Sequence, residues 1–230
     1  MSVYETDFEV IKKADQSPVT QADLAAHRII AKGLKDLAPH TPLISEEADI
    51  PSYEERQGWK RFWIVDPLDG TKEFVKRNGE FTVNIALIEN EQPVIGVVYA
   101  PTTDVFYYAE TLKGAWKKEA GRPPQRIFSE PADPNAPLVI ITSRSHGAPE
   151  LEDFLQKYQV KDRLYAGSSL KICLVAEGKA DVYPRFGPTM EWDVAAADCV
   201  YRNSARCGQH ASSLLYNKPD LRNQRFVIGF

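Results

Sequence analysis

Cysteines are scarce in this sequence, basic residues are not clustered, and long apolar runs are missing. The three cysteines, Cys173, Cys199 and Cys207, lack CxxC spacing, which argues against a disulfide framework or a zinc site. The 28 basic and 32 acidic residues are mixed along the chain, which excludes the charge pattern of a protein that binds nucleic acid polymers. No stretch approaches the roughly 20 apolar residues that span a bilayer. With no signal peptide, the sequence predicts a globular cytoplasmic protein, and peripheral association with the inner face of the cell membrane stays open.

The first half of the chain predicts one helix followed by antiparallel strands. Residues 17–37 are typical of a helix that Thr20 caps at its N-terminus. The apolar face of this helix is expected at Ala26, Ile30, Leu34 and Leu37. Residues 61–66 form a short buried-strand pattern, and β-rich runs in residues 81–101 and 105–110 predict an antiparallel meander.

After a proline-rich linker, the pattern changes to alternating strands and helices. Strands are expected at residues 138–142, 163–167 and 180–186, and helices at 149–159, 168–178 and 192–203. Such alternation is typical of α/β layers. The sequence therefore predicts an α+β lobe over residues 1–125 and an α/β lobe over residues 126–230, joined in one compact unit.

The segment DPLDGT, residues 66–71, combines two aspartates with residues that shape a turn. A buried strand ends at Asp66, Pro67 fixes φ and lacks an N–H, and Gly70 permits close backbone approach. The two carboxylates and the Leu68 carbonyl are hard oxygen donors of the kind that Mg²⁺ prefers. These residue types are equally common in solvated surface turns, so the segment alone does not decide between a turn and a cation site.

Two further acidic segments favour the cation site. Glu46 and Glu47 follow a short apolar run, and Asp193 stands in the first turn of a predicted helix. Taken singly, tandem glutamates suit a solvated surface, and an aspartate at a helix start suits a cap. In combination with DPLDGT they make a cation site the better interpretation of that segment.

The segments SEE (residues 45–47), WIVDPLDGTKEF (63–74) and EWDVAAAD (191–198) resemble a known superfamily in order and approximate spacing. It is the lithium-sensitive, magnesium-dependent phosphatase superfamily, which includes inositol monophosphatases, fructose bisphosphatases and bisphosphate nucleotidases. The segments SRSH, GSSLKICLVAEG and YPRFGPTMEWD are similar to its CysQ-type 3′(2′),5′-bisphosphate nucleotidase branch. Members usually carry another helix before the segment that begins here at Met1, so that first helix is expected to be missing from this chain.

The resemblance implies a layered αβαβα sugar-phosphatase-like fold and a site for Mg²⁺. One ion would be held by Glu46, in preference to Glu47, with Asp66 and the Leu68 carbonyl, and a second by Asp66, Asp69 and Asp193. Thr71, paired with Asp23, would orient and help deprotonate the attacking water. The local sequence also allows Asp23 to act as a capping-box residue that reaches back to Thr20, and the two roles are compatible.

The resemblance also implies residues that bind substrate. Phosphate contacts are expected from Gly70, Thr71, Gly167, Ser168, Ser169 and Lys171, and nucleotide or ribose contacts from Ser143, His146 and Arg185. The alternatives for these residues are an ordinary capped helix with a solvated lysine, an inert loop histidine, and a surface ion pair for Arg185.

The activity implied is removal of the 3′-phosphate from 3′-phosphoadenosine 5′-phosphate, giving AMP and phosphate, with a role in sulfur metabolism. The sequence fits a monomer or a homodimer. An inositol or sugar-phosphate phosphatase is the first alternative, which Lys72 and Glu73 after the DGT disfavour. A non-catalytic phosphate-binding protein is the second, which the intact acidic segments disfavour.

Overall fold

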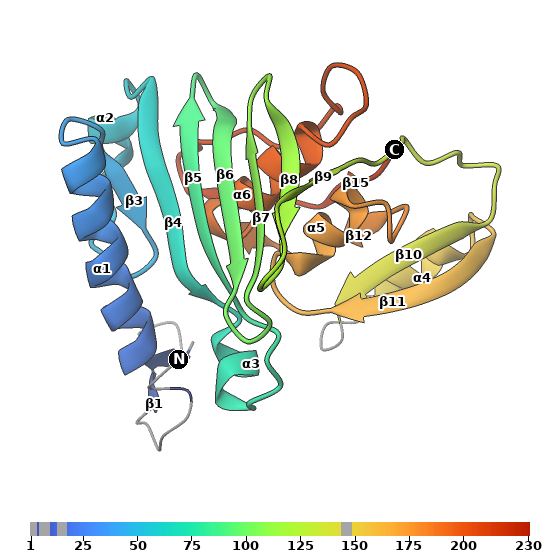
Figure 1. Ribbon diagram of the computed structural model, residues 1–230, viewed down its shortest axis with the longest axis horizontal. Helices are drawn as coiled ribbons and strands as arrows, with labels where there is room; N and C mark the ends of the chain where they lie inside the picture. Colours follow the sequence, from blue (N-terminus) through green and yellow to red (C-terminus); the bar gives the residue numbers. More distant parts are fainter. Residues whose placement is uncertain (1–3, 5–9, 13–17, 144–148) are drawn as a thin grey trace.

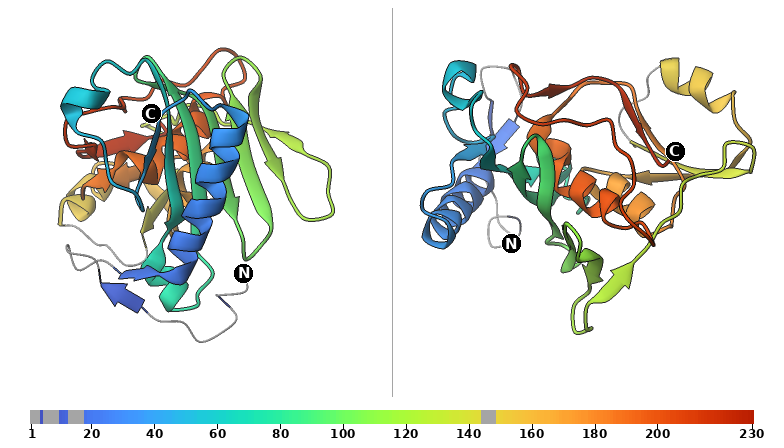
Figure 2. Two further views of the ribbon diagram at one scale, coloured as in Figure 1. Left: turned by 90° about the vertical axis from the view of Figure 1, so that its left-hand side faces the viewer. Right: turned by 90° about the horizontal axis from the view of Figure 1, so that it is seen from above.

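The computed structural model describes residues 4, 10–12, 18–143 and 149–230. These residues form five alternating layers of helix and sheet (Figure 1). One helix covers the outer face of a large sheet, two helices lie between it and a smaller sheet, and a fourth covers the far face of the smaller sheet, as the view from above in Figure 2 shows. In this order the helices are α1 (Gln21–Leu37), α5 (Leu170–Ala176) with α6 (Glu191–Arg202), and α4 (Pro149–Leu155). The expected αβαβα arrangement is confirmed.

The large sheet has seven strands that are neighbours in chain order. They are β3 (Leu43–Ser45), β4 (Arg61–Asp69), β5 (Thr82–Glu89), β6 (Gln92–Ala100), β7 (Val105–Glu110), β8 (Gly114–Lys118) and β9 (Gln125–Ile127). Only β3 and β4 pair in parallel, and every later pair is antiparallel, so the predicted meander is confirmed.

The second half of the chain alternates strands and helices as predicted. Strand β10 (Leu138–Ser143) pairs in parallel with β11 (Val160–Ala166), and β12 (Tyr183–Arg185) pairs with β15 (Phe226–Ile228). A bridge between Ile140 and Val182 connects the two pairs into the smaller sheet. The short elements are β1 (Val10–Lys12), β2 (Pro18–Thr20), α2 (Tyr53–Arg56), α3 (Thr71–Val75), β13 (Thr189–Met190) and β14 (Arg222–Asn223).

Helix α6 lies at the centre of the molecule and packs on the large sheet. Its small side chains at Ala195, Ala196 and Ala197 are buried. A Cβ added at Gly96 of β6 would lie 2.4 Å from the Ala196 carbonyl oxygen, so glycine is required for this close approach. One hydrophobic core therefore joins residues from both halves of the chain, while the division into lobes at residue 125 stays a prediction.

Helix α1 begins and packs largely as its sequence predicts. The Ala22 amide donates to Thr20 Oγ1 at 3.1 Å, so Thr20 is the N-cap. Ala26, Ile30 and Leu34 are partly buried. The prediction for Leu37 is wrong, because this side chain is 74% exposed. Periodicity identifies the inner side of a helix but does not reveal where the sheet beneath it ends.

Candidate active site

The end of β4 turns two aspartates toward one cavity. Asp66 lies opposite Asn84 of β5, and the register then shifts before Asp69 lies opposite Thr82. Within the shift, the Leu68 amide donates to Asp66 Oδ1 at 2.9 Å. Strand β4 therefore continues past the predicted end at Asp66, because the irregular pairing accommodates a proline that lacks an N–H.

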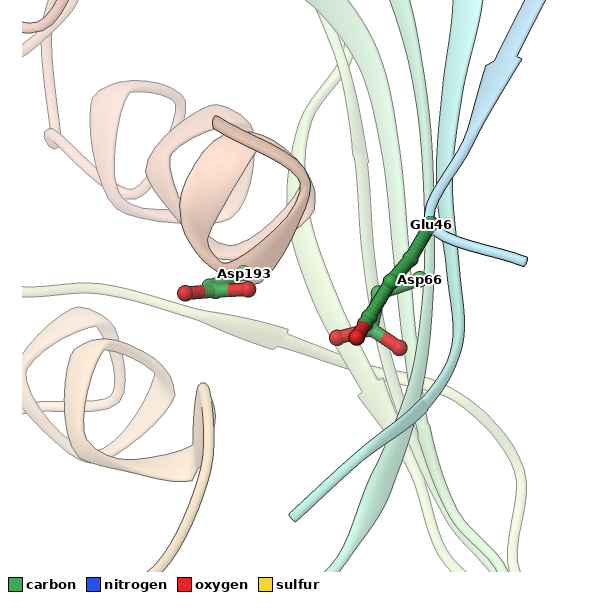
Figure 3. Close-up of side chains that lie close together, drawn as sticks. All are labelled: Glu46, Asp66 and Asp193. Carbon is green, nitrogen blue, oxygen red and sulfur yellow. The ribbon is translucent and has the colours of Figure 1, made fainter. Parts of the chain in front are cut away.

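Three carboxylates converge in this cavity (Figure 3). Glu46 follows β3, Asp66 lies on β4, and Asp193 projects from the first turn of α6 on the opposite side. One oxygen of each lies within 4.8 Å of those of the other two, and among the described residues these three form the group close enough to share a cation. Asp69 lines the same cavity but is not one of the three.

These carboxylates are buried and repel one another. Burial, with the negative charges of Glu46, Asp69 and Asp193, raises the pKa of Asp66 well above its usual value. Burial, followed by the charge of Asp69, likewise raises the pKa of Asp193. Buried like charges are costly unless a cation neutralises them, and an all-oxygen ligand set suits a hard divalent cation. The residues therefore fit a metal ion at this site.

Asp69 is hydrogen-bonded by residues that do not belong to the group of three carboxylates. The Ser169 amide donates to Asp69 Oδ2 at 2.9 Å, and the Asn84 side-chain amide lies 3.4 Å from the same oxygen. Burial raises the pKa of Asp69 to about 6, while the Lys171 ammonium opposes that shift. Asn84 was missed by the sequence reasoning, although a buried polar residue in the apolar strand TVNIALI was a usable signal.

Asp23 makes the contacts that both of its predicted roles require, while its part in catalysis stays a prediction. Its Oδ2 accepts from the Thr20 amide at 2.8 Å and from the Thr20 hydroxyl at 2.6 Å, which completes the capping box of α1. Its Oδ1 accepts from the Thr71 hydroxyl at 3.2 Å. One buried carboxylate thus caps a helix with one oxygen and holds Thr71 with the other.

The cavity has a volume of about 330 Å³ and is lined by both acidic and basic side chains. Besides Glu46, Asp66, Asp69 and Asp193, its lining includes Leu68, Gly70, Thr71, Ser143, Gly167, Ser168, Ser169, Lys171 and Arg185. The structure therefore gathers the predicted metal and substrate residues around one space, together with Thr71 of the predicted catalytic pair. His146 lies outside the described residues.

The basic wall is formed by Lys171 and Arg185. Lys171 is only 5% exposed, and its ammonium donates to the Ser168 carbonyl at 2.6 Å, so the alternative of a solvated lysine is wrong. Burial lowers the pKa of Lys171 to about 8. Arg185 donates to the Gly187 and Pro188 carbonyls. Carbonyls are neutral acceptors, so these bonds leave positive charge on the cavity wall.

Residues 167–169 are the predicted phosphate loop, and the side-chain hydroxyls of its two serines form hydrogen bonds within the protein. Ser168 Oγ lies 2.8 Å from the Asp69 carbonyl oxygen and 2.9 Å from the Glu80 carbonyl oxygen, and these two acceptors share its single hydrogen. Ser169 Oγ donates to Asn84 Oδ1 at 2.8 Å. The loop is therefore fastened to the end of β4 and to β5, while direct contact between these two serines and substrate stays a prediction.

Within the described ranges, no helix has the length and apolar character to cross a membrane. All three cysteines are free thiols, two of them buried and Cys207 exposed.

A layered fold with an acidic metal site beside a basic cavity wall defines a metal-dependent phosphatase. The inositol monophosphatase family model matches residues 1–205, and the chain belongs to this family, whose members depend on metal. It is 54% identical over 212 residues to the 3′(2′),5′-bisphosphate nucleotidase CysQ of Shigella flexneri, covering 91% of this chain and 82% of that protein.

Solved structures show the same fold. The crystal structure of CysQ from Bacteroides thetaiotaomicron matches with a TM-score of 0.82 and 43% identity, over 99% of this chain and 90% of the other. An IMPase of Thermotoga maritima matches with a TM-score of 0.74 and 24% identity, over 98% of this chain and 83% of the other. The expected superfamily and fold are confirmed.

Proposed function

We propose that the protein is a magnesium-dependent 3′(2′),5′-bisphosphate nucleotidase that converts 3′-phosphoadenosine 5′-phosphate to AMP and phosphate. The observation that carries this proposal is the pairing of an all-oxygen carboxylate group with the basic side chains of Lys171 and Arg185 in the lining of one small cavity. A substrate with two phosphates suits this pairing, because one phosphate faces the metal ligands while the other needs cationic donors. The identity to a protein named as a 3′(2′),5′-bisphosphate nucleotidase supports the same substrate class.

The carboxylates are proposed to hold Mg²⁺ in two positions. Glu46, Asp66 and the Leu68 carbonyl would hold one ion, and Asp66, Asp69 and Asp193 a second. When bound, magnesium neutralises the phosphate dianion, favours formation of the nucleophile and stabilises the leaving oxygen. The raised pKa values of Asp66 and Asp193 support the need for a cation there.

Thr71 and Asp23 are proposed to handle the proton of the attacking water. The Thr71 hydroxyl donates its own hydrogen to Asp23 Oδ1, so its lone pairs remain available to accept a hydrogen bond from water. The proton passes from the water to Thr71 Oγ1 as the hydroxyl proton moves toward Asp23 Oδ1. The amides of Gly70 and Thr71 are proposed to donate to the phosphate that is cleaved.

The second phosphate is proposed to bind the basic wall. Lys171 and Arg185 line the cavity beside the loop that contains Gly167. At pH 7 the Lys171 ammonium stays mainly protonated, because its pKa is lowered only to about 8. Ser143, Ser168 and His146 keep their proposed places near the nucleotide.

Replacing Lys171 with methionine is expected to weaken binding of the bisphosphate. A hydrogen bond to a charged group is worth about 1.5–3 kcal/mol, so KM is expected to rise roughly 10-fold to 100-fold. Steady-state kinetics with adenosine 3′,5′-bisphosphate measures KM, and adenosine 3′-monophosphate, which lacks the second phosphate, is the control substrate. An equal rise in KM for both substrates would remove Lys171 from the second-phosphate site.

A substrate panel tests the function as a whole. Phosphate release is measured from adenosine 3′,5′-bisphosphate, adenosine 2′,5′-bisphosphate, inositol 1-phosphate and fructose 1,6-bisphosphate, with and without magnesium and lithium. We expect magnesium-dependent release, inhibited by lithium, with the highest kcat/KM for adenosine 3′,5′-bisphosphate. Preference for inositol phosphate would reject the nucleotide substrate, and no release by folded protein would reject the enzyme.

We also propose a cytoplasmic location, because free thiols are typical of a reducing compartment. The enzyme is proposed to act as a monomer or homodimer, which sedimentation of the purified protein distinguishes.

A further inference from the structure

A buried row of polar side chains links the phosphate loop to the metal ligands. Thr82 Oγ1 lies 3.0 Å from Ser169 Oγ, which lies 2.8 Å from Asn84 Oδ1. The Asn84 Nδ2 atom in turn lies 3.4 Å from Asp69 Oδ2. Thr82, Asn84 and Ser169 are each at most 3% exposed, so water does not compete for these groups.

The neighbours of the Asn84 amide fix its orientation and the direction of the row. Its Nδ2 faces two acceptors, Asp69 Oδ2 and the Asp193 carbonyl oxygen at 3.5 Å. Its Oδ1 must then accept the Ser169 hydroxyl hydrogen, which leaves Ser169 Oγ to accept from Thr82. Every donor in the row therefore points toward Asp69.

This arrangement assigns different tasks to the two oxygens of Asp69. Oδ2 accepts the Ser169 amide at 2.9 Å and faces the Asn84 amide, which leaves Oδ1 as the oxygen available to a cation. The longer contact between Asn84 and the Asp193 carbonyl also connects β5 to the first turn of α6. Asn84 thus stands between two segments that carry acidic ligands.

We propose that Asn84 and Ser169 are positioning residues that orient Asp69 for cation binding. This proposal rests on the proposed metal-dependent function and assigns Ser169 a role through Asp69, in place of direct contact with substrate. Groups that hydrogen-bond to metal ligands typically change metal affinity or activity about 10-fold to 100-fold when they are lost.

The experiment compares Asn84→Ala and Ser169→Ala with Tyr107→Phe. Ser169→Ala keeps the backbone amide on Asp69 but removes the hydroxyl between Thr82 and Asn84. The control removes a different partly buried hydrogen bond, from Tyr107 to Glu177 at 3.0 Å, whose residues do not line the cavity. Thermal unfolding is followed as magnesium alone is titrated, and kcat and KM are then measured at several magnesium concentrations.

For Asn84→Ala, the magnesium concentration at half-maximal stabilisation is expected to rise about 10-fold, with a smaller rise for Ser169→Ala and none for Tyr107→Phe. Excess magnesium is expected to restore much of kcat, and KM for the bisphosphate is expected to stay unchanged. The proposal would be overturned if a folded Ser169→Ala protein kept the wild-type magnesium midpoint. It would also be overturned if KM for the bisphosphate rose while the magnesium midpoint stayed unchanged. Because the magnesium titration contains no substrate, its result stands even if the bisphosphate is the wrong substrate.

Discussion

Asp66→Asn is expected to lower kcat about a thousand-fold or more and, at the same time, to stabilise the metal-free protein. Metal ions supply several kcal/mol of transition-state stabilisation, and each 1.36 kcal/mol is a factor of ten in rate. Asparagine keeps the oxygen that accepts the Leu68 amide but removes the charge proposed to hold both ions. Steady-state phosphate release and thermal unfolding in a chelator measure the two effects.

The gain in stability follows from the proton balance of the metal-free site. Because the pKa of Asp66 is raised in the folded state, the folded protein binds more protons than the unfolded chain above about pH 4. The free energy of unfolding therefore falls as the pH rises, and Asp69, with its pKa raised to about 6, contributes with the same sign. In chelator, we expect the free energy of unfolding of wild type to fall as the pH rises from about 4 to 6 and beyond. The decrease should be smaller for Asp66→Asn.

In chelator at pH 7 to 8, the variant is expected to unfold at a higher temperature than wild type. Each kcal/mol gained raises Tm by about 2–4 °C in a chain of this size. With magnesium, wild type should unfold at the higher temperature, because a ligand that binds only the folded state stabilises it and the variant binds magnesium more weakly. Asp104→Asn is the matched control, because Asp104 is exposed and accepts a hydrogen bond from the Tyr99 hydroxyl outside the cavity. This variant should keep the wild-type kcat and the wild-type unfolding temperature in both chelator and magnesium. Retained turnover in Asp66→Asn would remove Asp66 from the metal site.

Thr71→Val is expected to lower kcat about 100-fold to 10,000-fold with little change in Tm. Valine has the shape of threonine but lacks the hydroxyl that bonds to Asp23 Oδ1. The partner variant Thr20→Val removes the hydroxyl on the other oxygen of Asp23. Loss of an N-cap costs about 0.5–2 kcal/mol, so this variant should lose stability while keeping most of its activity.

The pair separates the two roles of Asp23 by measuring kcat and Tm for both proteins. Thr71→Val with wild-type kcat would reject the proton-handling role. Equal loss of kcat in both variants would show that the cap, through the placement of α1, accounts for the effect of Thr71.

Local sequence patterns predicted most element types, because periodicity and turn residues act over short distances. The meander of β5 to β7 and the helix at α6 are examples. Strand β4 was predicted too short, since proline usually ends a strand and only the register shift opposite β5 lets pairing resume at Asp69.

The site was predicted less completely than the fold. Glu46, Asp66 and Asp193 were found because acidic residues stand out beside apolar runs, and the family resemblance joined them. Asn84 was missed because its partner Ser169 is 85 residues away, and no local pattern reports such a contact. Whether Ser168 and Ser169 face substrate or protein also depends on tertiary structure.

The proposed role of Asp23 would make hydrolysis sensitive to the folding of the first turn of α1. Helix ends open far more readily than cores, and the first turn of α1 depends on Asp23 Oδ2. A molecule in which that turn has frayed keeps Glu46, Asp66 and Asp193 on the core elements but loses the fixed partner of Thr71. Under the proposed mechanism, hydrolysis would therefore require this single helical turn to stay formed, and molecules in which only that turn has opened would be inactive before the core melts.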